Sequence, residues 1–216
     1  MNVKKFYTND GWRLNKKNIT IDAEIFEDNR KVASSYVSKC RLRIARYIPI
    51  KGRDILDFAS GPIQYKEYLK YSKNFKFRHC VDFSKKAILD AKKKIGKKGK
   101  FYNRDFFNIK FKENFFDCII SLHTIYHIKK NLQKKAVEKL IYSTKKGCPI
   151  IIVYSNPNTL INKLKKIINF KARKKKNQLY FYCHDIKWWF RFKKIASIKM
   201  YPWRSFSAQH QKLLMP

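Results

Sequence analysis

The spacing of hydrophobic and polar residues along the chain changes near residue 50. From residue 22 to about residue 48, apolar residues recur near helical spacing, with Asp22 as the expected N-cap and Pro49 as the stop. After that, short apolar runs alternate with amphipathic stretches. The apolar runs predict strands at 54–59, 77–83, 101–106, 117–122 and 149–155. Helical patterns lie between them at about 64–72, 84–95 and 131–144.

The ends of the predicted helices carry signals of their own. We expect Ser84 and Asn131 to be N-caps, and the sequence Lys145-Lys-Gly147 to close the helix that begins at Asn131. Repeated strand–helix–strand units need right-handed crossovers, so they predict an α/β fold whose parallel sheet has helices on both faces. Ligands of such sheets bind at the carboxyl ends of the strands.

The last sixty residues are less regular. They predict a basic helix at 158–169, a Lys-rich loop at 171–177 and a sixth strand at 195–201, whereas 205–216 would make a poor strand. We therefore expect two parts: an N-terminal segment and helical cap over 1–49, and a domain over 50–216 with an insertion at about 156–194.

Composition limits the class of protein. A chain of 216 residues with 44% hydrophobic and 16% aromatic residues is not disordered. No apolar run approaches the roughly 18 residues that cross a bilayer, and residues 1–6 lack the apolar stretch of a signal peptide. The five cysteines are never spaced as Cys-x-x-Cys, which favours reduced thiols over disulfides or zinc ligands. We expect a cytoplasmic protein with no membrane span and no metal.

The net charge of +36 would attract nucleic acid. However, Lys far outnumbers Arg, and two-pronged recognition of phosphates and bases favours Arg. Lys, Asn, Ile, Phe and Tyr also share AT-rich codons, so a base-biased genome explains much of the charge. A nucleic-acid partner stays an open alternative that we do not favour.

Residues suited to cofactor binding stand where the predicted strands end. The first strand runs through Asp57 into a small-residue turn, Ala59-Ser60-Gly61. The second strand ends in Asp82-Phe83 and the third in Asp105-Phe106. A tight turn lets the backbone approach a ligand, and a carboxylate at the next strand end accepts hydrogen bonds from ribose hydroxyls. This arrangement predicts a site for a nucleoside cofactor.

The order of these motifs resembles that of class I S-adenosylmethionine-dependent methyltransferases over about residues 50–156. The first motif of that family, acid-x-Gly-x-Gly-x-Gly, stands here as Asp57-Phe-Ala59-Ser-Gly61-Pro-Ile63, with two glycines replaced. Residues 116–123 are similar to the fourth strand, and 145–149 to the Lys-Pro-Gly-Gly turn before the fifth. The resemblance implies a Rossmann-like, mostly parallel methyltransferase sheet, which we expect to lack the usual final antiparallel strand.

The resemblance also implies S-adenosyl-L-methionine as cofactor and a role for each position. Asp57, Ala59, Ser60 and Gly61 would support the methionine part, and Asp82 the ribose. Phe83, Asp105 and Phe106 would lie at the adenine. An NAD site is disfavoured because Pro62-Ile63 closes the space that a pyrophosphate needs.

Candidates for the chemistry follow the fourth predicted strand. His123 and His127 lie four residues apart, and either could serve as general base or substrate anchor, with ordinary packing as the alternative. They lack a third partner for zinc. Tyr7, Trp12, Trp188, Trp189 and Trp203 would either line an acceptor pocket or lie in the core.

We therefore predict a methyltransferase that acts at oxygen or nitrogen of a small or medium-sized metabolite, with residues 156–194 facing the substrate. Two alternatives stay open. One is an RNA methyltransferase that uses the basic surface, and the other is a non-catalytic methyltransferase-like binding protein.

Overall fold

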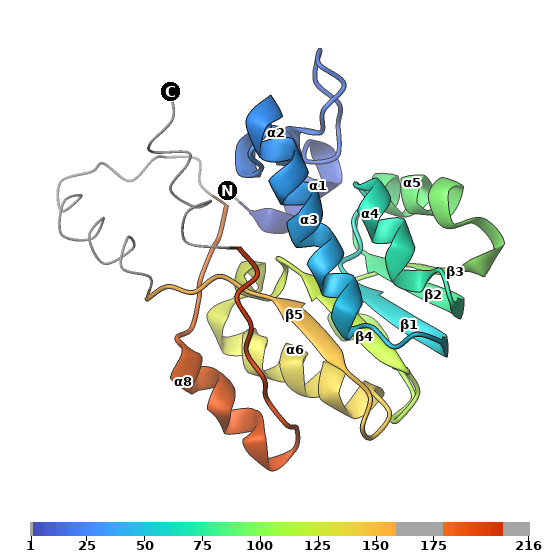
Figure 1. Ribbon diagram of the computed structural model, residues 1–216, viewed down its shortest axis with the longest axis vertical. Coiled ribbons are helices and arrows are strands. Elements are labelled where there is room, and N and C mark those ends of the chain that lie inside the picture. Colours follow the sequence, from blue (N-terminus) through green and yellow to red (C-terminus); the bar gives the residue numbers. More distant parts are fainter. Residues whose placement is uncertain (1, 159–178, 205–216) are drawn as a thin grey trace.

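Five strands pair in one parallel sheet whose order is β3-β2-β1-β4-β5. The structure is a computed structural model that describes residues 2–158 and 179–204 (Figure 1). The strands are β1 (Gly52–Phe58), β2 (Phe75–Asp82), β3 (Gly99–Asn103), β4 (Cys118–Leu122) and β5 (Ile150–Val153). The predicted Rossmann-like α/β sheet is thus confirmed. The chain adds strands on one side of β1, up to β3, and then crosses to the other side to form β4 and β5. The strand order therefore reverses between β1 and β4, and folds of this kind bind ligands at the carboxyl ends of the strands at that point.

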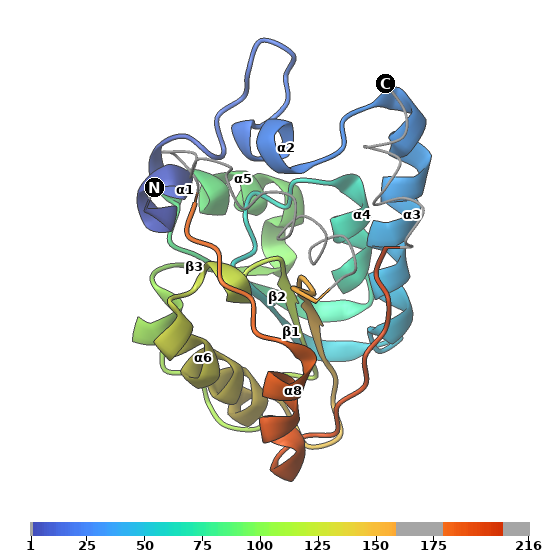
Figure 2. The same cartoon turned by 90° about the vertical axis from the view of Figure 1, so that its left-hand side faces the viewer.

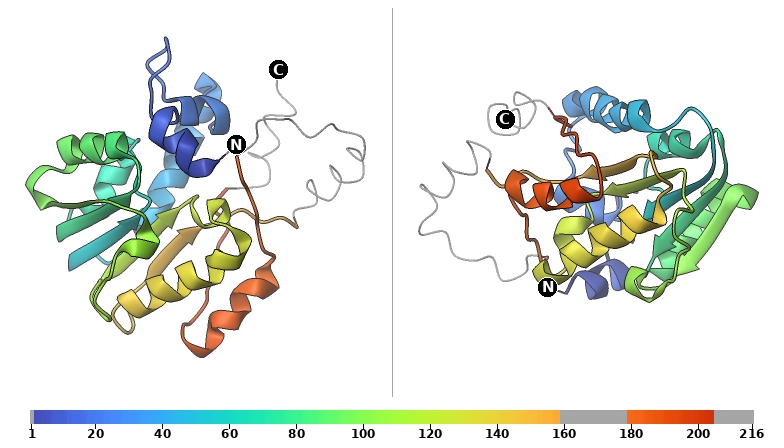
Figure 3. Two further views of the ribbon diagram at one scale, coloured as in Figure 1. Left: turned by 180° about the vertical axis from the view of Figure 1, so that it is seen from behind. Right: turned by 90° about the horizontal axis from the view of Figure 1, so that it is seen from below.

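Helices cover both faces of the sheet (Figures 1 and 3). One face packs Ile55, Cys80 and Ile120 against α3 (Ser34–Ile44), α4 (Lys66–Leu69) and α5 (Lys85–Ile95). The other face packs Leu56, Val81 and Ile119 against α6 (Lys130–Ser143) and α8 (Ile186–Trp189). The alternation of residues between the two faces explains the continuous apolar strands seen in the sequence.

The N-terminal segment differs from the prediction. The single helix expected from residue 22 to about 48 is wrong, because α2 (Ile21–Phe26) and α3 are separate helices. Between them, Asn29 donates its side-chain amide to the Ala23 carbonyl at 2.7 Å, and a short 3₁₀ turn follows at Lys31–Ala33. Such local bonds compete with a continuous helix. The N-cap of α2 is Thr20 rather than Asp22.

The predicted caps of the later helices are partly confirmed. Ser84 caps α5 by accepting the Ala87 amide. Asn131 lies inside α6, which begins one residue earlier and has no side-chain cap. That helix ends at Ser143, with Thr144 extended, so Gly147 and its positive φ belong to the next turn instead of the helix end.

The C-terminal part contains α8, a 3₁₀ turn (Phe190–Lys194) and an extended strap over 195–204. The sixth strand expected at 195–201 is wrong, because these residues pair with no strand. Instead, the strap is fixed to α3: the Trp203 indole donates to the Cys40 carbonyl at 2.9 Å, and Arg43 donates to the Trp203 carbonyl at 2.7 Å. The predicted Lys-rich loop, residues 205–216 and nearly all of the predicted basic helix lie outside the described residues.

Two further findings concern the parts that the structure describes. No helix there is long and apolar enough to cross a membrane. All five cysteines are free; Cys40, Cys80 and Cys118 are buried, and Cys148 and Cys183 are half-buried.

Candidate cofactor and acceptor site

A large cavity opens at the carboxyl edge of the sheet, where the strand order reverses. Its walls there come from the turn after β1, the ends of β2, β4 and β5, the N-terminal segment and the strap, and the hollow continues along the whole of β5, between α6 and the strap, to the turn before that strand. Figure 2 shows α1 (Val3–Asn9) and α2 on one side of this edge, away from α6 and α8. The cavity is therefore formed by elements that are far apart in the sequence.

The turn after β1 has an unusual backbone. Ala59, Gly61 and Ile63 all have left-handed φ values, of 54°, 56° and 50°. These are the three positions that carry glycine in the family motif. Only glycine adopts this conformation without a steric cost, and a β-branched residue is the worst suited to it. The turn thus keeps the shape of the glycine motif although two of the glycines are replaced.

Asp82 joins this turn to the end of β2. Its Oδ2 accepts the Gly61 amide at 3.0 Å, and its Oδ1 accepts the Ser84 amide at 2.8 Å. The residue is 6% exposed, and burial raises the pKa of its carboxyl to about 6 while the two amides oppose the rise. Each carboxylate oxygen keeps a further lone pair that can accept a hydroxyl group. Phe83, which follows Asp82, is half-buried and also lines the cavity.

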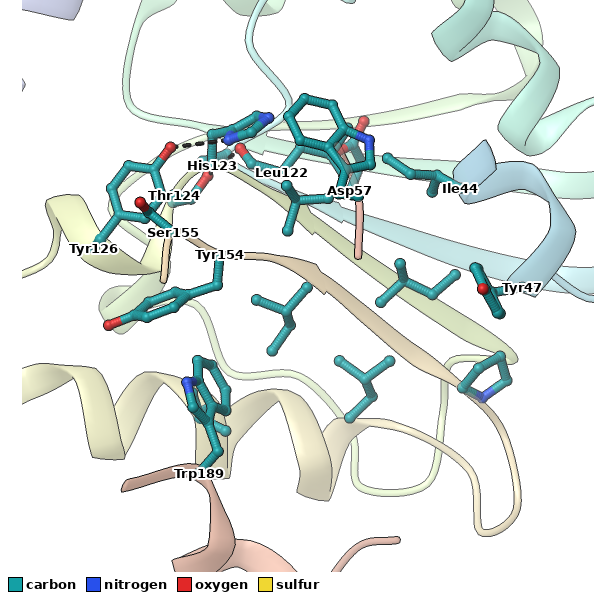
Figure 4. A pocket seen from close by; sticks show the side chains of 18 of the residues that line it. Ile44, Tyr47, Asp57, Leu122, His123, Thr124, Tyr126, Tyr154, Ser155 and Trp189 are labelled. Atoms are coloured by element: carbon teal, nitrogen blue, oxygen red, sulfur yellow. Dashed lines mark hydrogen bonds between the residues drawn. The ribbon is translucent and has the colours of Figure 1, made fainter. Parts of the chain in front are cut away.

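Asp57 lies at the cavity wall (Figure 4), and its negative charge is paired with an arginine of the neighbouring strand. Its Oδ2 accepts two bonds from the guanidinium of Arg78 on β2, at 2.5 and 3.2 Å. Burial raises the pKa of Asp57, and the Arg78 charge opposes that rise. The strand register explains the pair, because Asp57 and Arg78 stand on the same face of neighbouring strands.

Asp105 and Phe106 do not line the cavity. The Asp105 carboxylate caps a 3₁₀ turn by accepting the Phe107 amide at 3.0 Å. Phe106 is 5% exposed and packs in the core, with its ring 4.1 Å from that of Phe58. The structure therefore brings Asp57, Ala59, Ser60, Gly61, Asp82 and Phe83 together and leaves this pair apart from them. Their adenine contact stays a prediction.

Both candidate histidines lie at the cavity, after β4. His123 has a φ of 58°, and its Nδ1 lies 2.9 Å from the Tyr126 hydroxyl, as Figure 4 shows. Burial, together with the nearby Arg204 charge, lowers the pKa of His123 to about 3, so its imidazole is neutral at pH 7.

His127 is arranged differently from His123. Its Nδ1 lies 2.8 Å from the Tyr180 carbonyl. A carbonyl only accepts hydrogen bonds, so this Nδ1 carries the proton and the Nε2 lone pair is left as an acceptor. Burial lowers the pKa of His127, and the Tyr180 carbonyl opposes that change.

Aromatic side chains of the N-terminal segment span the distance between the turn and His127. The Trp12 ring comes within 3.0 Å of where a β-carbon on Gly61 would lie. The Tyr7 ring is centred 5.0 Å from that of Trp12 and 6.4 Å from that of His127. The Tyr7 hydroxyl donates to Asp22 at 2.8 Å.

Among the aromatics named from the sequence, Tyr7, Trp12, Trp189 and Trp203 line the cavity, whereas Trp188 is buried in the core. Two residues of the cavity wall, Asp22 and Tyr126, are not predicted by the sequence patterns. Asp22 gave no signal beyond its resemblance to a helix cap, and Tyr126 gave none beyond its place next to His127. No group of three or more potential metal ligands occurs within 2–158 and 179–204.

Comparisons with known proteins agree with this geometry. The family model described as a methyltransferase domain matches residues 56–152. No curated protein matches the chain. Among solved structures, magnesium protoporphyrin IX methyltransferase from Synechocystis PCC 6803, with bound S-adenosylhomocysteine, has a TM-score of 0.61 at 17% identity, over 86% of this chain and 83% of that one.

Two further structures share the fold. The YcgJ protein of Bacillus subtilis has a TM-score of 0.54 at 15% identity, over 74% of this chain and 67% of that one. An S-adenosylmethionine-dependent methyltransferase from Leishmania major has a TM-score of 0.53 at 11% identity, over 69% and 58%. Residues 56–152 thus match a methyltransferase domain, and the sheet around them has the fold of class I S-adenosylmethionine-dependent methyltransferases, with the left-handed turn that Asp82 holds at its carboxyl edge.

Proposed function

We propose that this protein binds S-adenosyl-L-methionine and transfers its methyl group to oxygen or nitrogen of a small or medium-sized acceptor. One observation carries the proposal: the Asp82 carboxylate is tied to the Gly61 turn and faces the same cavity as His127. The polar groups at the turn fit an adenosyl cofactor, because the Asp82 carboxylate has lone pairs left to accept hydrogen bonds from ribose hydroxyls. It does not fit a pyrophosphate, since Pro62 has no amide hydrogen to offer at the turn.

The cofactor, when bound, supplies an electrophilic methyl group on a sulfonium. The work of this chain is to hold the cofactor and the acceptor in line, which is the main source of rate in such a displacement. Asp82 and the turn hold the donor side. His127 is our candidate catalytic base, because its Nδ1–H is oriented by Tyr180 and its Nε2 can take a hydroxyl or amine proton.

His123 suits a positioning role better than that of a base. An imidazole whose pKa is about 3 holds a proton too weakly to remove one from an alcohol or amine at neutral pH. Its contact with the Tyr126 hydroxyl orients a side chain that is 7% exposed at the cavity. We therefore assign His123 to holding Tyr126 in place.

The covering of the site supports a small acceptor. Trp12 packs on Gly61, and Trp203 from the strap packs on His123 with ring centres 4.5 Å apart. These two rings narrow the site near the turn and near His123, which favours a small acceptor over a polymer. Residues of the expected substrate-facing insertion contribute Phe181, His184 and Trp189 to the wall. The Synechocystis protein, by its name, also methylates a small molecule.

The first test is cofactor binding by calorimetry. We expect the wild type to bind S-adenosylmethionine and S-adenosylhomocysteine, and Asp82→Ala to weaken both by at least about tenfold, because a charged acceptor of two ribose hydroxyls is lost. Glu138→Ala on α6, whose carboxylate pairs with Lys134 and does not line the cavity, is the control and should bind as the wild type does. Equal affinity of Asp82→Ala and wild type would refute the ribose assignment.

The second test separates binding from chemistry. His127→Gln should retain its affinity for S-adenosylhomocysteine but lose about 10² or more in kcat, measured by transfer of labelled methyl to the best acceptor from a panel of phenols, carboxylic acids and amines. A variant that transfers methyl at the wild-type rate would show that His127 is not the base.

A further inference from the structure

We propose that Lys94 is a positioning residue of the cofactor site: its ammonium group holds the turn after β1 in the shape that cofactor binding requires. This inference rests on the proposed function, since it concerns the same cofactor. Lys94 belongs to α5, and neither the sequence motifs nor the family resemblance points to it.

The contacts of Lys94 are specific. Its Nζ donates to the Pro62 carbonyl at 2.9 Å and to the Ile63 carbonyl at 2.8 Å. Within the described residues, no backbone amide donates to either carbonyl, and no carboxylate lies within ion-pair distance of Lys94. Its neighbours behave differently: Asp90 pairs with Lys86 at 2.9 Å and lies 3.9 Å from Lys93. Lys94 therefore directs its charge at the turn instead of at the helix surface.

The turn needs support at this end. Ile63 is fully buried and holds a φ of 50°, a conformation that disfavours its branched side chain. The first half of the turn is tied to β2 by the Ser60 amide, which donates to the Val81 carbonyl at 3.0 Å, and by the Gly61 amide on Asp82. Lys94 supplies the tie for the second half. A strained backbone persists only where its surroundings determine it, and here the surroundings include this ammonium group.

The link from Lys94 to the cofactor runs through Gly61. In this short turn the Gly61 amide donates to Asp82, and the carbonyls of the next two residues, Pro62 and Ile63, accept from Lys94. A shift of the backbone at Ile63 therefore also moves Gly61. Loosening the Ile63 end should misplace the Gly61 amide and with it the Asp82 carboxylate. Where glycine stands at the third motif position, the backbone needs no such restraint. Lys94 thus offsets the replacement of that glycine by Ile63.

The experiment uses three variants of the full chain and S-adenosylhomocysteine as the probe. Lys94→Met keeps the aliphatic stem and removes the donors, and we expect its Kd to rise about tenfold. Lys94→Arg restores donors to both carbonyls and should stay within about threefold of the wild type. Lys93→Met removes an equal charge one residue away, where the side chain is 80% exposed, and should leave the Kd unchanged. Hydrogen exchange of the Gly61 amide should speed up in Lys94→Met alone.

The possible results separate this inference from the proposed function. If the wild type binds no S-adenosylhomocysteine, the proposed function fails. If the wild type binds and Lys94→Met binds equally well, the positioning role is wrong while the proposed function stands. Equal weakening in Lys94→Met and Lys93→Met would show an effect of net charge and would also overturn the positioning role. Weakening in Lys94→Met with rescue in Lys94→Arg and faster exchange at Gly61 supports it.

Discussion

At the scale of single residues, the turn after β1 contains a conflict between side chain and backbone that a substitution can relieve. Ala59 holds a φ of 54° and is half-buried. A left-handed conformation costs an L-residue roughly 1–2 kcal/mol, whereas glycine costs roughly 0.5–1 kcal/mol in lost chain entropy. Ala59→Gly should therefore raise the free energy of unfolding by about 0.5–1 kcal/mol, measured by urea denaturation.

The control for this prediction is an alanine with ordinary helical geometry. Ala87 lies in α5 and is fully buried, so Ala87→Gly should lower the free energy of unfolding by about 1 kcal/mol or more. Opposite signs for the two substitutions are required. A loss of stability in Ala59→Gly would mean that the contacts of its methyl group outweigh the strain.

The same residue scale shows what the sequence could and could not predict about the site. The acid at position 82 was predictable because it ends a strand next to the turn. The partner of Asp57 was not, since pairing with Arg78 depends on a strand register that no local pattern encodes. The family resemblance implies an adenine contact for Phe106, and no local pattern predicted that its ring packs on that of Phe58 in the core.

At the scale of elements, the central sheet was predictable and the two ends of the chain were not. The three central strands β1, β2 and β4 are largely buried runs, which is a strong local signal, whereas the edge strands β3 and β5 are mostly half-buried or exposed. The break between α2 and α3 was hidden because Ile25 and Val32 continue the apolar spacing, yet both are exposed, at 53% and 65%. The strap was mistaken for a strand because what fixes it is distant: Trp203 and Cys40 lie 163 residues apart.

At the scale of the whole molecule, buried ionisable groups in the cavity make stability depend on pH in opposing ways. Burial raises the pKa of Asp22 and of Asp82 to about 6, so between about pH 6 and 3.8 the folded state keeps protons that the unfolded chain has released. These two groups therefore favour the folded state more as the pH falls through that window. His123 acts in the opposite direction, since burial lowers its pKa to about 3.

The contribution of His123 can be isolated by comparing the wild type with His123→Asn, because asparagine tolerates the φ of 58° at this position. Below its ordinary pKa of 6.5, the unfolded chain binds a proton at His123 that the folded chain excludes until about pH 3. The wild type should thus lose stability relative to the variant by about 1.4 kcal/mol per pH unit below 6.5, or about 2 kcal/mol between pH 7 and 5. Urea denaturation of both proteins at the two pH values measures this difference. A gap between the proteins that does not change with pH would mean that His123 is protonated in the folded state as readily as in water, and the neutral pair with Tyr126 would then be wrong.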